Sequence, residues 1–188
     1  MTPRPSSKRG LVLVTGGSGY VAGHCIAQLL NDGWSVRTTV RSVAKAKAVR
    51  ASIGAIASNA SEIAIVEADL NSNVGWDTAA IGAQYVLHVA SPVPVTDPKN
   101  DDELVRPARD GTLRVLKAAR DAGVKRVVMT SSISAIIYGR GAREEPFTEE
   151  DWTDETNRRD TSPYDRAKTI AERAAWAWLA AEGGDWSS

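Results

Sequence analysis

Short, continuous runs of apolar residues alternate along the chain with longer stretches in which apolar residues recur at every third or fourth position. A continuous apolar run bounded by turn residues is typical of a strand buried on both faces of a parallel sheet. Recurrence at three-to-four spacing is typical of an amphipathic helix that packs on such a sheet. The expected strands are 11–14, 36–40, 63–66, 85–89 and 124–129, and the expected helices are 21–30, 43–56, 103–121 and 163–181.

This alternation predicts an α/β fold, a doubly wound parallel sheet of the Rossmann type. Right-handed crossovers in such a sheet place ligands at the carboxyl ends of the strands. Pro163 stands near the expected start of the last helix, whereas Pro107 is expected to break the helix over 103–121 at its start. Residues 139–162 form a connection that is long for a compact domain, and its position after the fifth strand favours a functional role.

The composition is that of an ordinary globular protein, with 188 residues of which 43% are hydrophobic and 24% charged. This length suits one domain with one core. Residues 1–9 are rich in proline, serine and basic side chains, and we expect them to form a disordered tail. Residues 10–188 are assigned to the single Rossmann domain.

Charge and cysteine content exclude several classes of function. Lysine plus arginine and aspartate plus glutamate both number 23, so the chain has no basic excess for a nucleic-acid or membrane surface. Cys25 is the lone cysteine, which rules out an internal disulfide, and neither His24 nor His88 has a partner at metal-ligand spacing. No run of about 18 apolar residues and no signal peptide occurs, so we expect a soluble, cytoplasmic protein without a metal ion.

A glycine cluster follows the first expected strand and precedes the first expected helix. It reads T-G-x-x-G-x-x-A from Thr15 to Ala22, where alanine stands in the place that a third glycine can take. Glycines let the backbone turn sharply and approach a pyrophosphate, whose charge the helix N-terminus then meets. A simple tight turn is the alternative, but the position between strand and helix favours a dinucleotide. The expected cofactor contacts here are Gly16, Ser18, Gly19, Tyr20 and Val21.

The end of the second expected strand indicates which dinucleotide is bound. A site for NAD carries an acidic residue there that accepts hydrogen bonds from the ribose hydroxyls. This chain has Arg41, followed by Lys45 and Lys47, and no acidic residue before Glu62. A guanidinium suits a 2′-phosphate, so we expect NADP(H) rather than NAD(H). The alternative is a solvated surface arginine.

Tyr164 and Lys168 stand four residues apart on the last expected helix, which brings both to one face. A nearby positive charge favours the phenolate and lowers the pKa of a tyrosine towards working pH. Such a tyrosine can protonate a carbonyl oxygen as hydride arrives from a nicotinamide. Thr130, Ser131 and Ser132 stand at the end of the fifth expected strand, and a hydroxyl there can hydrogen-bond the same oxygen, although hydroxyls at strand ends are more often simple caps.

Together these motifs resemble the extended short-chain dehydrogenase/reductase family, especially its dihydroflavonol-reductase and cinnamoyl-CoA-reductase branch. The resemblance covers residues 11–181 and rests on VTGGSGYVA, VRTTVR, ADL, HVASP, PARDGTLRVLKAA, VVMTSS, EEDWTD and YDRAKTIAERAAW, in that order. It implies a catalytic triad of Ser132, Tyr164 and Lys168, with Lys168 also binding the nicotinamide ribose. It further implies that Asp69 and Leu70 flank the adenine and that Val89, Ala90 and Ser91 line the dinucleotide.

The chain departs from the family pattern after the triad. Only 20 residues follow Lys168, where the family continues into another strand and a smaller C-terminal substrate domain. We therefore expect a chain that lacks the substrate domain. Ala22 and Arg114, the latter at a position where relatives often carry asparagine, are smaller departures.

The leading expectation is an NADPH-dependent reductase of a ketone or aldehyde, with a small-molecule carbonyl compound as its substrate. An epimerase or dehydratase of sugar nucleotides shares the fold and the triad, but those enzymes usually retain NAD, against which Arg41 speaks. A third alternative is a non-catalytic dinucleotide-binding remnant, which the short C-terminal part favours. Similar proteins pair through helices that flank the sheet, so a homodimer is also expected.

Overall fold

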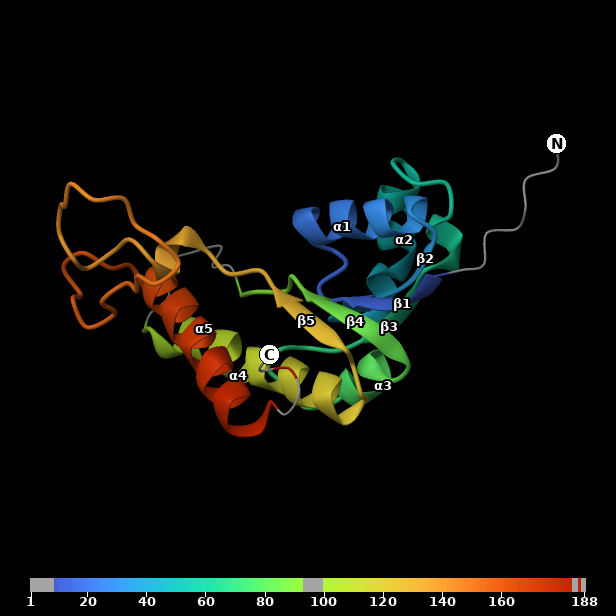
Figure 1. Cartoon of the computed structure of the whole chain (residues 1–188). Helices are drawn as coiled ribbons and strands as arrows, with labels where there is room; N and C mark the ends of the chain where they lie inside the picture. Colours follow the sequence, from blue (N-terminus) through green and yellow to red (C-terminus); the bar gives the residue numbers. More distant parts are fainter. Residues whose placement is uncertain (1–8, 93–99, 184–185, 187–188) are drawn as a thin grey trace. The chain divides into compact units, whose positions relative to one another are not determined.

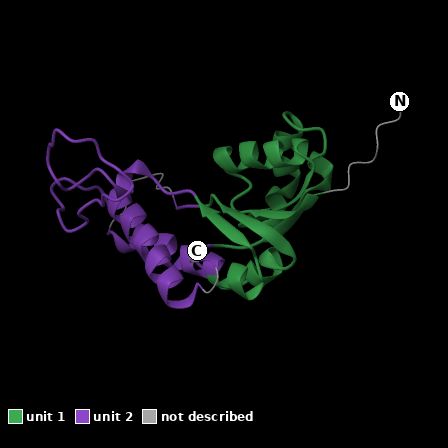
Figure 2. Ribbon diagram, in the orientation of Figure 1, with its two compact units in different colours: residues 1–69, 73–90, 117–129 green, residues 70–72, 91–116, 130–188 purple. Residues whose placement is uncertain are grey.

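A computed structural model describes residues 9–92, 100–183 and 186 of the chain. They fall into two compact units (Figure 2): residues 1–69, 73–90 and 117–129 make up unit 1, and residues 70–72, 91–116 and 130–188 make up unit 2. Both units include parts of the range 10–188, whose assignment to one domain stays a prediction. Most of the expected tail, residues 1–8, lies outside the described residues.

Unit 1 contains a parallel sheet of five strands in the order β3-β2-β1-β4-β5. Helices α1 and α2 lie on one face of this sheet and α3 lies on the other (Figure 1), which confirms the expected doubly wound arrangement. The elements are β1 (Arg9–Val14), α1 (Tyr20–Asn31), β2 (Trp34–Val40), α2 (Ala46–Gly54), β3 (Ala64–Glu67), α3 (Trp76–Ala80), β4 (Ala83–His88) and β5 (Arg126–Met129).

Successive side chains of the central strand β1 contribute to the core of unit 1 on opposite faces of the sheet. Val12 and Val14 of β1 pack with Ile26 of α1 and Ile53 of α2 in one buried cluster. Leu13, between the two valines, points to the opposite face of the sheet and is buried there with 1% of its surface exposed. Because both faces of β1 are covered, the strand reads in the sequence as an uninterrupted apolar run.

Unit 2 is built on the packing of two long helices, α4 (Asp102–Asp121) and α5 (Pro163–Glu182), of which α4 contributes its residues up to 116. Leu104, Val105 and Ala108 of α4 pack against Ala167 and Ala171 of α5. Small residues on α5 allow this close approach, since alanine adds little volume at the contact.

A capping box and an ion pair fix the start of α5. The side chain of Ser162 accepts a hydrogen bond from the backbone of Asp165, whose carboxylate accepts one from the backbone of Ser162, and Pro163 stands in the first turn as expected. Arg166 is 6% exposed and its guanidinium donates two hydrogen bonds, of 2.9 and 2.7 Å, to the carboxylate of Asp101. This ion pair ties the helix to the segment that precedes α4 and lowers the pKa of Asp101.

The structure corrects two sequence expectations and adds one helix. Helix α4 runs through Pro107 without a break, because a proline in the second turn removes one backbone hydrogen bond while the buried side chains around it hold the helix in place. Arg9, assigned to the tail, begins β1 and donates its backbone N–H to the carbonyl of Gly33. Helix α3 was not expected, because five residues are too few for a helical period to show.

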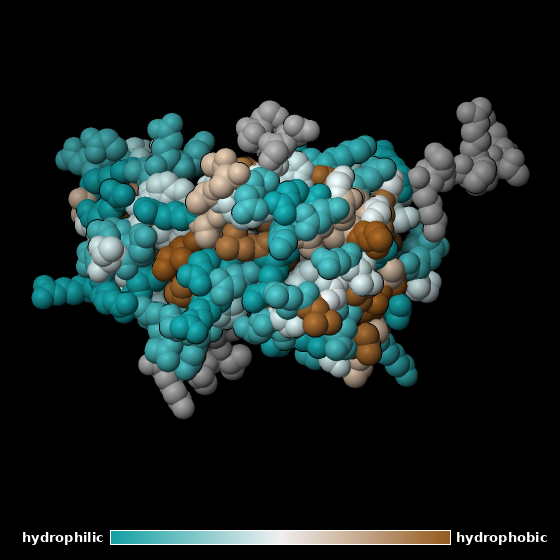
Figure 3. Space-filling model, turned by 90° about the horizontal axis from the view of Figure 1, so that it is seen from below, coloured by the Kyte–Doolittle hydropathy of each residue, from teal (hydrophilic) through white to brown (hydrophobic). Residues whose placement is uncertain are grey.

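Hydrophobic side chains also reach the surface of the molecule. On the face drawn in Figure 3 they form separate brown patches among hydrophilic residues. The large exposed ones include Tyr20 and Val21 at the start of α1, Val128 on β5 and Trp176 on α5. In the described part of the chain, none of the helices has both the length and the apolar character needed to cross a membrane.

Candidate functional site

The glycine loop between β1 and α1 has the conformation that the sequence predicts for a phosphate loop. Gly16 has a φ of +77°, a value that L side chains rarely adopt. A Cβ atom on Gly16 would also lie 3.0 Å from the Cβ of Ala90, in the segment that follows β4. Both the backbone angle and this close approach therefore require glycine at position 16.

Gly17 is required for a different reason, which is its contact with β2. A Cβ atom at Gly17 would lie 2.3 Å from the Oγ1 atom of Thr38, whose hydroxyl is itself bonded to the carbonyl of Val14 at 2.6 Å. The backbone N–H groups of Gly16 and Gly17 donate to the hydroxyl and the carbonyl oxygen of Thr39, at 3.0 and 2.8 Å. These bonds hold the loop against the end of β2.

The N-terminus of α1 is left open to an anion. Gly19 is its N-cap and provides no side-chain cap, and the first turn contains no acidic residue. The exposed residues Tyr20 and Val21 form the start of that turn, 83% and 51% of their surfaces being accessible. Uncapped N–H groups and the helix dipole favour a phosphate at this position.

A buried hydroxyl connects the loop to β4. Thr15, with 0% of its surface exposed, accepts hydrogen bonds on Oγ1 from the backbone N–H groups of Val89 and Ala90, at 3.1 and 2.9 Å. Its oxygen also lies 2.9 Å from Nδ1 of the buried His88. Since both acceptor sites of the hydroxyl are occupied, the hydroxyl donates to Nδ1, and His88 carries its own hydrogen on Nε2. The sequence predicted a structural role for His88 but did not predict this hydrogen bond.

Replacing Thr15 with valine is expected to lower the free energy of unfolding by about 2–3 kcal/mol, because two backbone N–H groups lose a buried acceptor. Serine at the same position keeps the oxygen and loses one methyl group, so its cost is about 1 kcal/mol. Urea denaturation of the two variants measures the difference. Equal losses for valine and serine would show that the methyl group, rather than the hydroxyl, stabilises this junction.

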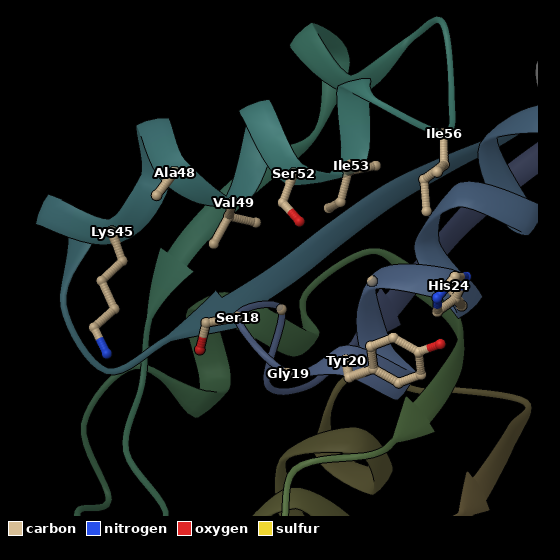
Figure 4. A pocket seen from close by; sticks show the side chains of 12 residues that line it. Ser18, Gly19, Tyr20, His24, Lys45, Ala48, Val49, Ser52, Ile53 and Ile56 are labelled. Carbon is tan, nitrogen blue, oxygen red and sulfur yellow. The ribbon is translucent and has the colours of Figure 1, made fainter.

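A pocket of about 670 Å³ adjoins the loop within unit 1. Figure 4 shows Ser18, Tyr20 and His24 on one side and the side chains of Lys45, Val49 and Ser52 on the other. The rings of Tyr20 and His24 stack edge to face, with their centroids 4.6 Å apart. Lys45 therefore places a cation at the same pocket as the serine of the phosphate loop, whereas Lys47 does not line it.

Arg41 directly follows the last residue of β2, as the sequence predicts. It is exposed, and within the described residues it forms no hydrogen bond or ion pair, so its guanidinium is available to a ligand. Glu67, at the end of the neighbouring β3, approaches the same region but accepts a hydrogen bond from the backbone N–H of Val43 at 2.9 Å. The end of β2 thus presents a cation where an NAD site has an acid.

The expected adenine-flanking residues are half-buried. In unit 1, the backbone carbonyl of Asp69 accepts a hydrogen bond from the indole of Trp76 at 3.1 Å. In unit 2, the carbonyl of Leu70 accepts one from the guanidinium of Arg114 at 2.6 Å. Arg114, a departure from the family pattern, therefore has a structural contact of its own. Ser91, which belongs to unit 2, is half-buried like Val89 and Ala90 of unit 1.

The three residues expected to carry the chemistry all lie in unit 2. The ammonium of Lys168 lies 5.9 Å from the centre of the Tyr164 ring, so α5 brings these two side chains together on one face. Ser132 precedes the 3₁₀ helix η3 (Ile133–Ala135), which packs against α5. The Ser132 hydroxyl also accepts a hydrogen bond from the backbone N–H of Ser134, at 3.2 Å, and so caps this short helix.

Burial changes the acidity of Lys168. The side chain is 8% exposed, and the loss of solvent lowers the pKa of its ammonium, an effect that the negative charge of Glu172 opposes. Tyr164 beside it is half-buried.

The polar connection over 139–162 is ordered by its own contacts. The buried Thr153 donates to the carbonyl of Ser134 at 2.7 Å and accepts the N–H of Tyr138 at 2.9 Å, which ties the connection back to η3. Arg143 binds both carboxylate oxygens of Asp151, at 2.8 and 2.6 Å, and holds the pKa of that carboxyl well below its usual range. Sequence reasoning marked this connection as functional, and the structure shows that it packs beside η3.

A five-stranded parallel sheet with a glycine loop between β1 and α1 defines a dinucleotide-binding fold. Residues 12–186 match the model of the NAD dependent epimerase/dehydratase family. The chain belongs to this family, as the motifs in its sequence indicate.

Curated relatives and solved structures agree with this assignment. The chain is 37% identical to tetraketide alpha-pyrone reductase 1 of Arabidopsis thaliana, covering 94% of this chain and 55% of that protein. It is 34% identical to dihydroflavonol 4-reductase of Zea mays, over 96% and 51% of the two chains. The structure of yeast methylglyoxal/isovaleraldehyde reductase with NADPH superposes with a TM-score of 0.80 at 26% identity, over 94% and 54%. The chain thus spans about half the length of the relatives it matches.

Proposed function

We propose that the protein is an NADPH-dependent reductase that converts a ketone or aldehyde to an alcohol. The observation that carries the proposal is the Tyr164–Lys168 pair, in which a buried ammonium lies beside a phenol on one helix face. The relatives named above are reductases, and this chain has their fold over the matched residues.

The residues of this chain have distinct tasks in the proposed reaction. Tyr164 donates its hydroxyl proton to the carbonyl oxygen, and the Lys168 ammonium stabilises the phenolate that remains. Ser132 hydrogen-bonds the same oxygen as negative charge develops on it. NADPH, when bound, would supply the hydride for the carbonyl carbon. Lys168 has a second task, which is to hold the nicotinamide ribose.

The proposed cofactor is NADP(H), and unit 1 offers groups that fit its charged parts. The open N-terminus of α1, with Gly16, Ser18 and Gly19 before it, fits the pyrophosphate. Arg41 and Lys45 supply cations for the 2′-phosphate. We further propose that Asp69, Leu70, Val89, Ala90 and Ser91 contact the adenine and the rest of the dinucleotide.

The test is a titration of the purified chain with NADPH and, separately, with NADH, followed by quenching of tryptophan emission. Saturable binding with a clear preference for NADPH is expected. Arg41→Ala is expected to raise the Kd for NADPH about tenfold, which corresponds to the loss of one charge-assisted contact at an exposed site. It should leave the Kd for NADH within about twofold, because NADH lacks the 2′-phosphate.

A matched pair of lysines provides the control. Lys45 lines the pocket beside Ser18, whereas Lys47 is exposed two residues away and does not. Lys45→Ala is expected to weaken NADPH binding and Lys47→Ala to leave it unchanged. If both substitutions weakened NADPH binding equally, the lysines would act only by general electrostatic attraction of the negatively charged cofactor.

The same titration, together with an assay of carbonyl reduction, separates the two alternatives. A preference for NADH would favour an epimerase or dehydratase that retains NAD, the activity after which the matched family is described. Binding of NADPH without reduction of any carbonyl compound would favour a non-catalytic dinucleotide-binding protein. We also propose a cytoplasmic location and a second copy of the chain as partner; both rest on the sequence.

A further inference from the structure

A carboxylate, that of Glu172, lies one helical turn beyond the Tyr164–Lys168 pair on α5. Glu172 follows Lys168 by four residues on α5, so both side chains emerge on the same face of the helix. Lys168 is buried, with 8% of its surface exposed. A buried ammonium is stable only when a charged or hydrogen-bonding group compensates for the water that it has lost.

The carboxylate of Glu172 is held from two directions. One oxygen accepts a hydrogen bond from the hydroxyl of Ser131, the residue immediately before Ser132. The other accepts one from the indole N–H of Trp176, at 3.3 Å, a turn further along α5. Two donors fix the orientation of the side chain, so its charge has a defined position relative to the face that carries Lys168.

Asp165, Arg166 and Arg173 of the helix have partners of their own, and the charge of Glu172 opposes the effect of burial on the pKa of Lys168. The pairs are Asp165 with Ser162, Arg166 with Asp101, and Arg173 with Glu155 at 3.6 Å. None of these pairs includes Tyr164, Lys168 or Glu172.

We propose that Glu172, fixed by Ser131 and Trp176, is a positioning residue that serves as the counter-charge of the buried Lys168 ammonium beside Tyr164. The proposal rests on the proposed reductase function, in which a protonated Lys168 stabilises the Tyr164 phenolate. Without the carboxylate, burial alone acts on Lys168, and the lysine loses its proton at lower pH. Ser131 thereby acquires a role distinct from that of Ser132, since it orients the counter-charge while Ser132 faces the carbonyl oxygen.

The experiment is a pH titration of Lys168 by NMR in the whole chain labelled with ¹³C-lysine, with the resonance assigned by its loss in Lys168→Arg. Glu172→Gln removes the charge and keeps one oxygen as an acceptor for either Ser131 or Trp176, so the apparent pKa of Lys168 is expected to shift downward. Ser131→Ala is expected to produce a smaller downward shift, because the carboxylate remains but loses one of its two donors. Rescue by Glu172→Asp, which restores a carboxylate, should be partial.

The matched control is Glu155→Gln, which removes one carboxylate from the same unit at the ion pair with Arg173. It is expected to leave the titration of Lys168 unchanged. An unchanged or raised pKa in a folded Glu172→Gln protein would overturn the proposal, as would equal shifts in both variants. The titration requires neither NADPH nor turnover, so failure of the reductase proposal and failure of this one are told apart.

Discussion

Replacing Tyr164 with phenylalanine is expected to lower the rate of NADPH-dependent carbonyl reduction by about 10²–10⁴-fold, which is the usual contribution of a positioned general acid. The substitution removes one oxygen atom and leaves the ring beside Lys168 in place. The Kd for NADPH is expected to stay within about twofold. Consumption of NADPH at 340 nm with a panel of ketones and aldehydes measures the first quantity, and tryptophan quenching measures the second.

Tyr138 supplies the matched control, because it is a second tyrosine of unit 2, 37% exposed and outside the Tyr164–Lys168 pair. Tyr138→Phe is expected to reduce carbonyl compounds at the wild-type rate. Turnover that persists in Tyr164→Phe would show that another group donates the proton. A wild-type chain that binds NADPH and reduces none of the compounds would contradict the reductase proposal itself.

The sequence sufficed to predict the sheet and the position of the glycine loop. Strands such as β1 are buried on both faces, so their apolar runs stand out from the rest of the chain. The T-G-x-x-G-x-x-A motif follows β1 at once, and backbone geometry confirms that Gly16 needs a positive φ. The Tyr164–Lys168 pairing was predictable as well, because four residues in a helix correspond to about one turn.

What the sequence could not reveal were contacts between residues far apart along the chain. The bond from Thr15 to His88 joins positions 73 residues apart, and that from Ser131 to Glu172 joins positions 41 apart. No local pattern encodes such pairs, since they depend on the register of β1 with β4 and on the packing of unit 2. The unbroken course of α4 through Pro107 has the same origin: tertiary packing outweighs a local preference.

Replacing Gly17 with alanine is expected to lower the free energy of unfolding by about 1–3 kcal/mol and to weaken NADPH binding. The added methyl group would lie 2.3 Å from Oγ1 and 2.7 Å from Cγ2 of Thr38, so either the loop or β2 must move. Gly23→Ala is the control, because no atom lies within 4 Å of its Cβ position in α1. That change is expected to stabilise the protein by about 0.5–1 kcal/mol, as alanine favours a helix.

A double-mutant cycle with Thr38→Ala assigns the effect of Gly17→Ala to this one contact. Thr38→Ala removes the two atoms that approach most closely and leaves its Cβ at 3.0 Å from the new methyl group. Alone it is expected to cost about 1 kcal/mol, for the lost hydrogen bond to Val14. Combined with Gly17→Ala it should cost less than the sum, by about 1 kcal/mol or more, in urea denaturation. Additive costs would mean that the strain at Gly17 comes from the backbone of the loop, and that β2 does not set its position.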